Sequence, residues 1–263
     1  MLGDKVRRNV LVSCDHGLMI VNRFDSNPQV GIGGFLLKHG NNNTVEADFA
    51  FKVLQDIENP IVIDVGANIG TYATWIAHFL EKKNGKIYCF EPQREVFQIL
   101  CGNFAINNLF NAYAYELALG SEEKFIELND VDYNQQGSFG AFTLTDVVLP
   151  EGRIAKLPTK QRIKMTTLDK FVEDYQLPKV DFIKIDAEGL DIDVMDGAQN
   201  VIKTFKPDLY VEYLNLGSTG VEDSSVEGRD RLINYLTPLG YKCLVVGHDI
   251  FATCRDILQP AAE

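Results

Sequence analysis

Residues 61–72 read I-V-I-D-V-G-A-N-I-G-T-Y, and they combine an apolar strand, a glycine turn and a helix start. The apolar run ends at Asp64, Gly66 and Gly70 follow, and a helix is predicted from about Tyr72. Glycines let the backbone turn sharply and approach a ligand, while the first N–H groups of a helix are available to polar ligand atoms. The order D-x-G-x-N-x-G differs from the dinucleotide fingerprint, which needs glycine in place of Asp64 and Ile69. We therefore predict a ligand-binding turn with an acidic first residue.

Short apolar runs alternate with helical patterns on both sides of this turn. Such alternation is typical of a parallel sheet with helices on both faces. Strands are predicted at residues 61–65, 86–91, 112–116, 182–186 and 209–213, with a closing pair at 241–246 and 250–253. Helices are predicted near residues 72–80, 94–107, 190–204 and 228–236. The predicted fold class is α/β, with a mostly parallel seven-stranded sheet.

Two parts of the chain depart from this alternation. Residues 1–58 are expected to form an N-terminal extension packed on the core, with strands at 9–13 and 18–22 and a helix at 46–57. Residues 59–263 are expected to form the main domain. Within it, the stretch at about 121–166 is punctuated by Gly, Asp, Asn and Pro, so we interpret it as an inserted hairpin or a substrate-side loop.

Glu91 ends the next predicted strand, about twenty residues beyond the last glycine, where nucleotide-binding α/β folds place an acid that binds ribose hydroxyls. A nicotinamide cofactor and S-adenosylmethionine predict the same acid, so Glu91 alone does not discriminate between them. Capping of the helix that begins after Pro92 is its structural alternative. Asp64 is more informative, because a buried carboxylate suits a cationic or amine-bearing ligand better than a pyrophosphate. S-adenosylmethionine carries both an ammonium and a sulfonium group.

Three segments together resemble the FkbM family of methyltransferases. They are V-I-D-V-G-A-N-I-G-T-Y at residues 62–72, F-E-P at 90–92 and D-F-I-K-I-D-A-E-G at 181–189, and Thr167-Leu168-Asp169 and Gly197-Ala198 also fit the pattern. The match spans roughly residues 60–212. The resemblance implies a class I, Rossmann-like methyltransferase fold, S-adenosyl-L-methionine as the methyl donor, and usually O-methylation of a sugar-bearing or polyketide-type small molecule.

The predicted cofactor site lies at the carboxyl ends of the strands, where open α/β sheets bind their ligands. Glu116 ends the strand that usually faces the adenine, and Ala118 and Leu119 could flank the ring, although ordinary packing explains small apolar residues there. The residues predicted to bind the cofactor are Asp64, Gly66, Ala67, Asn68, Gly70, Thr71, Glu91, Pro92, Glu116, Ala118, Leu119 and Asp186.

Methyl transfer to oxygen is an in-line displacement that needs near-attack geometry and usually the removal of one proton. Asp186 and Glu188 follow the fourth main strand, so one could contact the cofactor and the other the acceptor hydroxyl; stabilisation of a helix start is the alternative. His248 is the best histidine candidate for a base, with an ordinary turn residue as its alternative. The predicted catalytic residues are Asp186, Glu188, Glu212 and His248.

The oxygen ligands near Asp186 raise the question of a metal. Glu212 and Asn215 could join Asp186 in a cluster able to hold magnesium. A polar cleft also collects such carboxylates, and no metal is predicted. The sequence Asp186-Ala187-Glu188-Gly189 also lacks the D/N/S-P-P-Y/F element of methyltransferases that act on the amino groups of bases, which favours oxygen as the acceptor atom.

The bulk composition narrows the class of protein further. The five cysteines are scattered without a C-x-x-C pair, so neither a disulfide framework nor a zinc cluster is indicated. The formal net charge of −12 disfavours a nucleic-acid partner; the basic run Lys156, Lys160, Arg162 and Lys164 is interpreted as a solvated loop. No apolar window suits a membrane span or a secretory signal, so a cytoplasmic protein acting on a small-molecule or carbohydrate acceptor is expected.

Two other functions stay open at this point. A nicotinamide-dependent oxidoreductase is disfavoured by the glycine turn and by the lack of a Tyr-x-x-x-Lys pair in residues 181–212. A module that binds S-adenosylmethionine without catalysis is equally compatible with an intact cofactor motif.

Overall fold

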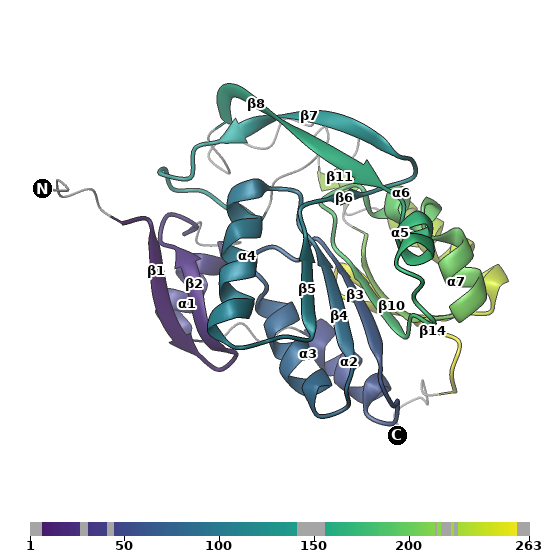
Figure 1. The fold of residues 1–263 in the computed structure, drawn as a ribbon. Helices are drawn as coiled ribbons and strands as arrows, with labels where there is room; N and C mark the ends of the chain where they lie inside the picture. Colours follow the sequence, from purple (N-terminus) through teal and green to yellow (C-terminus); the bar gives the residue numbers. More distant parts are fainter. Residues whose placement is uncertain are drawn as a thin grey trace, which may run out of the picture.

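A seven-stranded sheet forms the centre of the computed structural model, which describes residues 7–26, 31–40, 45–140, 156–213, 215–216, 222–223 and 226–256. The strand order is β13-β14-β10-β9-β3-β4-β5 (Figure 1). Its strands are β3 (Ile61–Val65), β4 (Lys86–Phe90), β5 (Ala112–Tyr115), β9 (Phe182–Ile185), β10 (Asp208–Glu212), β13 (Lys242–Val246) and β14 (Asp249–Thr253). From β5 to β10 all neighbours pair in parallel, while β14 is antiparallel to β10 and to β13. This is the mostly parallel sheet predicted from the sequence.

Helices cover both faces of the sheet. One face packs against α2 (Val45–Leu54), α3 (Thr71–Glu81) and α4 (Arg94–Ile106). The other packs against α5 (Leu168–Asp174), α6 (Asp191–Asp196), α7 (Gln199–Phe205) and α8 (Val226–Leu236), which the 3₁₀ turn η1 (Thr237–Leu239) follows. Successive residues of a strand face opposite sides of the sheet. Ile61 and Ile63 therefore pack on the side of α5–α8, whereas Val62 and Asp64 point to the side of α2 and α3.

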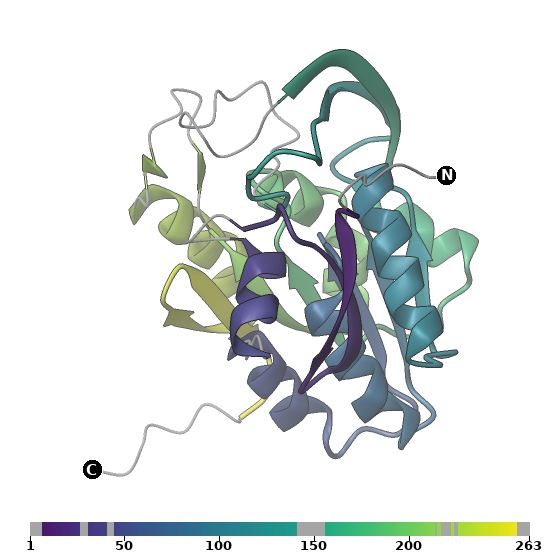
Figure 2. The same cartoon turned by 90° about the vertical axis from the view of Figure 1, so that its left-hand side faces the viewer.

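The N-terminal segments add a hairpin and a helix beside α4. Strands β1 (Asn9–Cys14) and β2 (Gly17–Asn22) pair in antiparallel fashion, and α1 (Ile32–His39) lies next to them (Figure 2). Asn103 of α4 joins this hairpin to the glycine turn, because its amide donates to the carbonyl oxygens of Ile20 and Ile69 at 3.2 and 2.7 Å. The division at residue 58 remains a prediction, but the hairpin itself contacts the core.

A second, three-stranded sheet lies across one end of the main sheet (Figure 1). It consists of β6 (Ala118–Leu119), β7 (Lys124–Val131) and β8 (Lys156–Thr166), and the predicted insertion at residues 121–166 contains the β7–β8 pair. Ile163 and Met165 face the core, whereas Lys160, Arg162 and Lys164 are exposed. Residues 215–216 and 222–223 form a further short pair, β11 (Asn215–Leu216) with β12 (Glu222–Asp223).

The helices differ from the prediction in four places, the first of which is α1, a helix that was not predicted. The expected helix at residues 190–204 is broken into α6 and α7, because the Gly197 carbonyl accepts a hydrogen bond from the Asp169 amide (2.9 Å) and any side chain at Gly197 would meet the Gly120 backbone. Helix α5 was not predicted; the Thr167 side chain caps it by accepting from the Lys170 amide at 3.0 Å. The predicted helix at 46–57 ends at Leu54. Within the described residues, no helix has the length and apolar character to cross a bilayer.

Candidate functional site

The glycine turn connects β3 to α3 through three residues with positive φ. Gly66, Asn68 and Gly70 have φ angles of 76°, 51° and 85°. At Gly66 the turn passes directly beside the end of β9, where any side chain would collide with the Asp186 carbonyl oxygen. Only glycine satisfies both the angle and the close approach, so this residue sets the distance between the first and the fourth core strands in the chain.

The amides of this turn are bonded within the protein. Gly66 N and Ala67 N both donate to the Phe90 carbonyl oxygen at 3.0 Å. The Asn68 amide donates to Glu91 Oε2 at 3.0 Å, and the Gly70 amide to the Ala67 carbonyl oxygen at 2.9 Å. The turn is therefore held in shape by the end of β4, and Thr71 is the first residue of the helix that follows it.

Glu91 is the buried acid that organises this region. Its side chain accepts from Asn68 N and, at 2.8 Å, from Gln93 N, where Gln93 is the N-cap residue of α4. The capping role considered for Glu91 is thus present in the structure, and each carboxylate oxygen keeps a second lone pair for a ligand. Burial raises the pKa of Glu91 to about 7, against the lowering effect of the two backbone hydrogen bonds.

Asp64 faces the α2–α3 side of the sheet and is completely buried. Neither of its carboxylate oxygens has a hydrogen-bond partner. Its neighbour in the strand register is Lys184 on β9, whose Nζ lies 3.6 Å from Asp64 Oδ1 and 3.1 Å from Asp186 Oδ2. Burial raises the pKa of Asp64 to about 6, and the nearby ammonium limits the rise. A buried carboxylate with unused acceptors suits a ligand that carries a positive charge or N–H donors.

Asp186 stands between this buried pair and a second group of acids. Its side chain keeps 40% of its surface exposed, and it shares a hydrogen bond with Glu212 at the end of β10. Burial, followed by the charges of Asp186, Asp191 and Glu188, raises the pKa of Glu212 well above its usual range. Glu212 therefore holds a proton more readily than an ordinary carboxyl group, which allows it to lie beside the Asp186 carboxylate.

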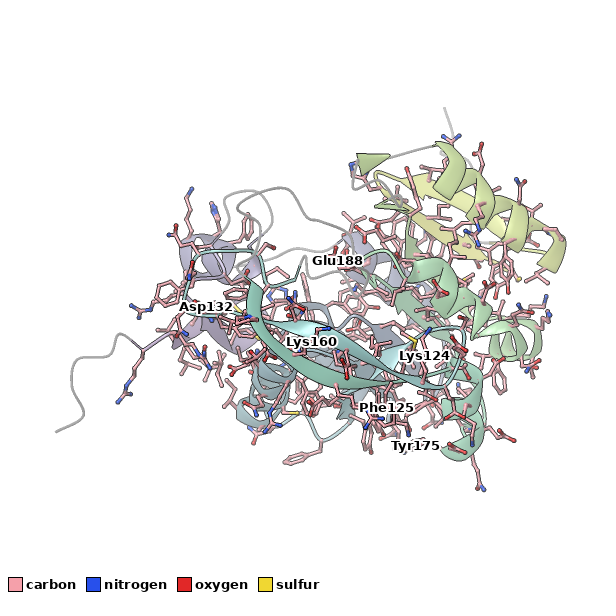
Figure 3. All side chains as sticks on the ribbon, turned by 90° about the horizontal axis from the view of Figure 1, so that it is seen from above. Lys124, Phe125, Asp132, Lys160, Tyr175 and Glu188 are labelled. Carbon is pink, nitrogen blue, oxygen red and sulfur yellow. The ribbon has the colours of Figure 1, made fainter. Side chains whose placement is uncertain are left out.

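The loop that follows β9 is shaped by another buried acid, Asp191. Its two oxygens accept from the amides of Ala187 (2.8 Å) and Gly189 (3.2 Å), while Glu188 and Gly189 adopt φ angles of 49° and 94°. Burial raises the pKa of Asp191 to about 7. Seen from above, Glu188 lies on one side of the β7–β8 pair, and Phe125 and Tyr175 lie on the other (Figure 3). Asp191 therefore fixes the loop that presents Glu188.

The other predicted residues are not all gathered at this point. Thr71 is buried at the start of α3 and Pro92 is partly buried after Glu91. Glu116 is exposed after β5, and Ala118 and Leu119 are buried in β6, where they pair with β8. His248 is exposed in the turn between β13 and β14, and its carbonyl oxygen accepts from Tyr213 N at 3.0 Å. The side chain of Asn215 lies outside the described residues.

Sequence patterns did not predict that Lys184, Glu46, Tyr210 and Asp249 lie beside the site. Glu46, from α2, lies near Lys184, Asp186 and Asp249, and burial raises its pKa. The Tyr210 hydroxyl donates to Asp249 Oδ2 at 2.9 Å. Lys184 had a usable signal, since a lysine inside an otherwise apolar parallel strand is rarely buried without a partner.

The segment that ends at Gly140 lies beside the glycine turn, since Gly140 is next to the Asn68 side chain. The two oxygens of Asp25 accept from Gly33 N at 2.9 Å and from Phe139 N at 3.0 Å. Gln93 binds the same segment through the Phe139 carbonyl oxygen (3.0 Å) and the Tyr133 hydroxyl (2.9 Å). Residues 133–139 are therefore tied both to the N-terminal extension and to the strand end that carries Glu91.

The acidic side chains around Asp186 are of a type that can bind metal ions. In the part of the chain that the structure describes, however, no three His, Cys, Asp or Glu side chains are grouped so that they could hold a metal ion. The carboxylates around Asp186 are instead bonded to Lys184, to one another or to backbone amides.

Comparison with known proteins matches a large part of this chain to one family. The model of the methyltransferase FkbM domain matches residues 64–243. Methyltransferase sdnD of Sordaria araneosa is 24% identical over 208 residues, covering 62% of this chain and 76% of that protein. Hexuronic acid methyltransferase AglP of Haloferax volcanii is 24% identical over 162 residues, covering 60% of this chain and 59% of the relative. The solved methyltransferase FkbM of Methylobacillus flagellatus is 16% identical with a TM-score of 0.49, covering 74% of this chain and 43% of that one.

Proposed function

The chain belongs to the methyltransferase FkbM domain family, which depends on S-adenosylmethionine, and on that premise we propose that it methylates a hydroxyl oxygen of a small molecule or a sugar. The observation that carries the proposal is the row of Asp64, Lys184 and Asp186 beside the glycine turn. It sets a buried carboxylate with unused acceptors next to a half-exposed one.

The residues around the turn fit the proposed cofactor. Asp64 offers two oxygens that accept no hydrogen bond to the cationic part of S-adenosylmethionine, and Glu91 offers its remaining lone pairs to the ribose hydroxyls. When bound, the cofactor supplies a methyl group on a sulfonium sulfur. This chain contributes the walls of the site: Gly66 allows the approach, and Gln93 holds Phe139 close to the end of β4 that carries Glu91.

Asp186 is the proposed partner of the acceptor hydroxyl. Because Lys184 and Glu212 both bond to Asp186, its side chain is held in one direction while part of its surface stays open. In that position Asp186 orients the acceptor hydroxyl and takes up the proton that this hydroxyl loses when its oxygen is methylated. Positioning supplies most of the expected rate gain, since an aligned pair of reactants avoids a large entropy cost. Glu188 and His248 are proposed to line the acceptor side.

A carbohydrate is the acceptor class with the most support. One relative is a hexuronic acid methyltransferase, and an open carboxylate such as Asp186 is a good acceptor for sugar hydroxyls. We also propose that the acceptor is not a nucleic acid, because a net charge of −12 repels polyanions.

The proposal is tested first by calorimetric titration with S-adenosylhomocysteine and with NAD. Binding of the former is expected, and Asp64→Ala and Glu91→Ala should each weaken it by about 1.5–3 kcal/mol, the value of a charge-assisted hydrogen bond. Tight NAD binding without binding of S-adenosylhomocysteine would instead identify an oxidoreductase.

Turnover is tested by methyl transfer from labelled S-adenosylmethionine to a panel of sugars, uronic acids and phenols. Asp186→Asn should abolish transfer while leaving cofactor affinity nearly unchanged. A wild-type chain that binds the cofactor but methylates no acceptor in the panel would favour the non-catalytic binding module.

A further inference from the structure

A buried lysine joins the carboxylate of the proposed cofactor site to that of the proposed acceptor site. Lys184 lies on β9, opposite Asp64 on β3, and Asp186 follows it two residues later on the same face. We propose that Lys184 is a positioning residue of methyl transfer, which keeps Asp64 charged for the cofactor and Asp186 directed toward the acceptor. The inference rests on the proposed function, because that function gives the two carboxylates their ligands.

The geometry gives Lys184 little freedom to act elsewhere. Its side chain is 7% exposed, and its Nζ lies 3.6 Å from Asp64 Oδ1 and 3.1 Å from Asp186 Oδ2. The Tyr72 ring lies 5.8 Å from the same Nζ. In the described residues, no other basic side chain is within ion-pair distance of Asp64 or Asp186. One ammonium group therefore serves both carboxylates.

The surroundings explain why an ammonium is needed at this point. A carboxylate removed from water without hydrogen bonds takes up a proton rather than staying charged. Asp64 has no hydrogen-bond partner, so the nearby Lys184 charge is what opposes its protonation. Burial alone would lower the pKa of Lys184, but the charges of Asp186, Asp64 and Glu46 outweigh this effect and raise it.

Titratable groups on its own strand and on the elements packed around it lie near this ammonium. They are Asp64 on β3, Cys89 on β4, Asp186 on β9, Tyr210 on β10, Asp249 on β14, Glu46 on α2 and Tyr72 on α3. The Tyr210 hydroxyl is bonded to Asp249, and burial raises the pKa of Cys89 and of Tyr72 well above their usual ranges. Among these groups, Asp64 has its pKa raised to about 6 by burial, so its charge responds to pH just below neutrality.

The test is the pH dependence of cofactor binding in Lys184→Met, which keeps the length of the side chain and removes its charge. Loss of an adjacent opposite charge raises a carboxylate pKa by about 1–3 units, so Asp64 should become neutral at pH values where the wild-type residue is ionised. Affinity for S-adenosylhomocysteine, measured by calorimetry, should fall roughly tenfold or more near pH 7 and recover as the pH approaches about 9.

Lys179→Met is the matched control. Lys179 pairs with Asp181 at 3.0 Å, just before β9 begins and away from the glycine turn. Its replacement should leave the pH profile of binding as in the wild type. A purely structural role for Lys184 predicts a different result, namely the same loss of affinity at every pH.

A second variant covers the case in which Lys184→Met does not fold. Asp64→Asn with Lys184→Met removes both charges of the buried pair and is expected to fold better than the single lysine variant. Its affinity should match that of Asp64→Asn alone within about twofold, because the two changes act through one interaction.

The outcomes separate the two proposals. A wild-type chain that binds no S-adenosylhomocysteine overturns the proposed function and with it the role of Lys184. If the wild type binds but Lys184→Met shows an unshifted profile, or the double variant binds much more weakly than Asp64→Asn, only the inference about Lys184 is wrong.

Discussion

Gly66→Ala should destabilise the protein more than the same change at another glycine with positive φ. At Gly66, φ is 76° and an added methyl carbon would lie 2.9 Å from the Asp186 carbonyl carbon and closer to its oxygen. Gly189 has a φ of 94°, but an added methyl carbon there meets nothing within 4 Å. Both variants incur the left-handed backbone cost of about 1–2 kcal/mol. Only Gly66→Ala adds overpacking against backbone, about 1–3 kcal/mol.

Urea unfolding of the two variants and the wild type measures this difference directly. The expected excess for Gly66→Ala is the overpacking value alone, about 1–3 kcal/mol, because the backbone cost cancels. Cofactor affinity should also fall in Gly66→Ala, since relief of the collision moves the turn away from Asp186. Equal destabilisation by the two substitutions would refute the assignment of Gly66 as the contact between β3 and β9.

Three further outcomes are expected. Asp25→Ala leaves two buried amides without acceptors, so it should cost roughly 1–3 kcal/mol for each and speed hydrogen exchange at Gly33 and Phe139; unchanged exchange would contradict the tie between the N-terminal extension and residues 133–139. Gln93→Leu removes the side chain that binds Tyr133 and Phe139, and limited proteolysis should then cut residues 133–139 faster than in the wild type. The folded-state pKa of Glu91 is raised to about 7, so the folded chain holds this proton more tightly and wild-type stability should fall as the pH rises from about 4.5 to about 7; Glu91→Gln should flatten that part of the stability curve, measured by thermal unfolding.

The main sheet could be predicted because its strands have distinct patterns. Residues 61–65 form β3 as expected, since a continuous apolar run bounded by a glycine turn is typical of a buried parallel strand. The break between α6 and α7 was missed because its cause is tertiary: Gly197 packs against the Gly120 backbone, which is distant in sequence. Local patterns contain no trace of that contact.

The candidate site residues at the strand ends could be predicted from the sequence, whereas those inside a strand or on a helix could not. Asp64, Glu91 and Asp186 follow apolar runs, and the topology places them along one edge. Lys184 contributes from the middle of a strand, and Glu46 from a helix of the N-terminal extension, so their positions depend on register and on packing. Neither register nor helix docking can be derived from spacing along the chain.

The position of Glu46 gives helix α2 a second role beside packing. Its buried side Ala47, Ala50, Val53 and Leu54 covers the sheet, and its first turn brings a carboxylate next to Lys184. Shortened chains that start at β3 would therefore lose more than a hydrophobic cover. Their cofactor affinity, and the pH dependence of that affinity, would change together with their solubility. A design that places the core sheet in another protein would therefore have to include this helix.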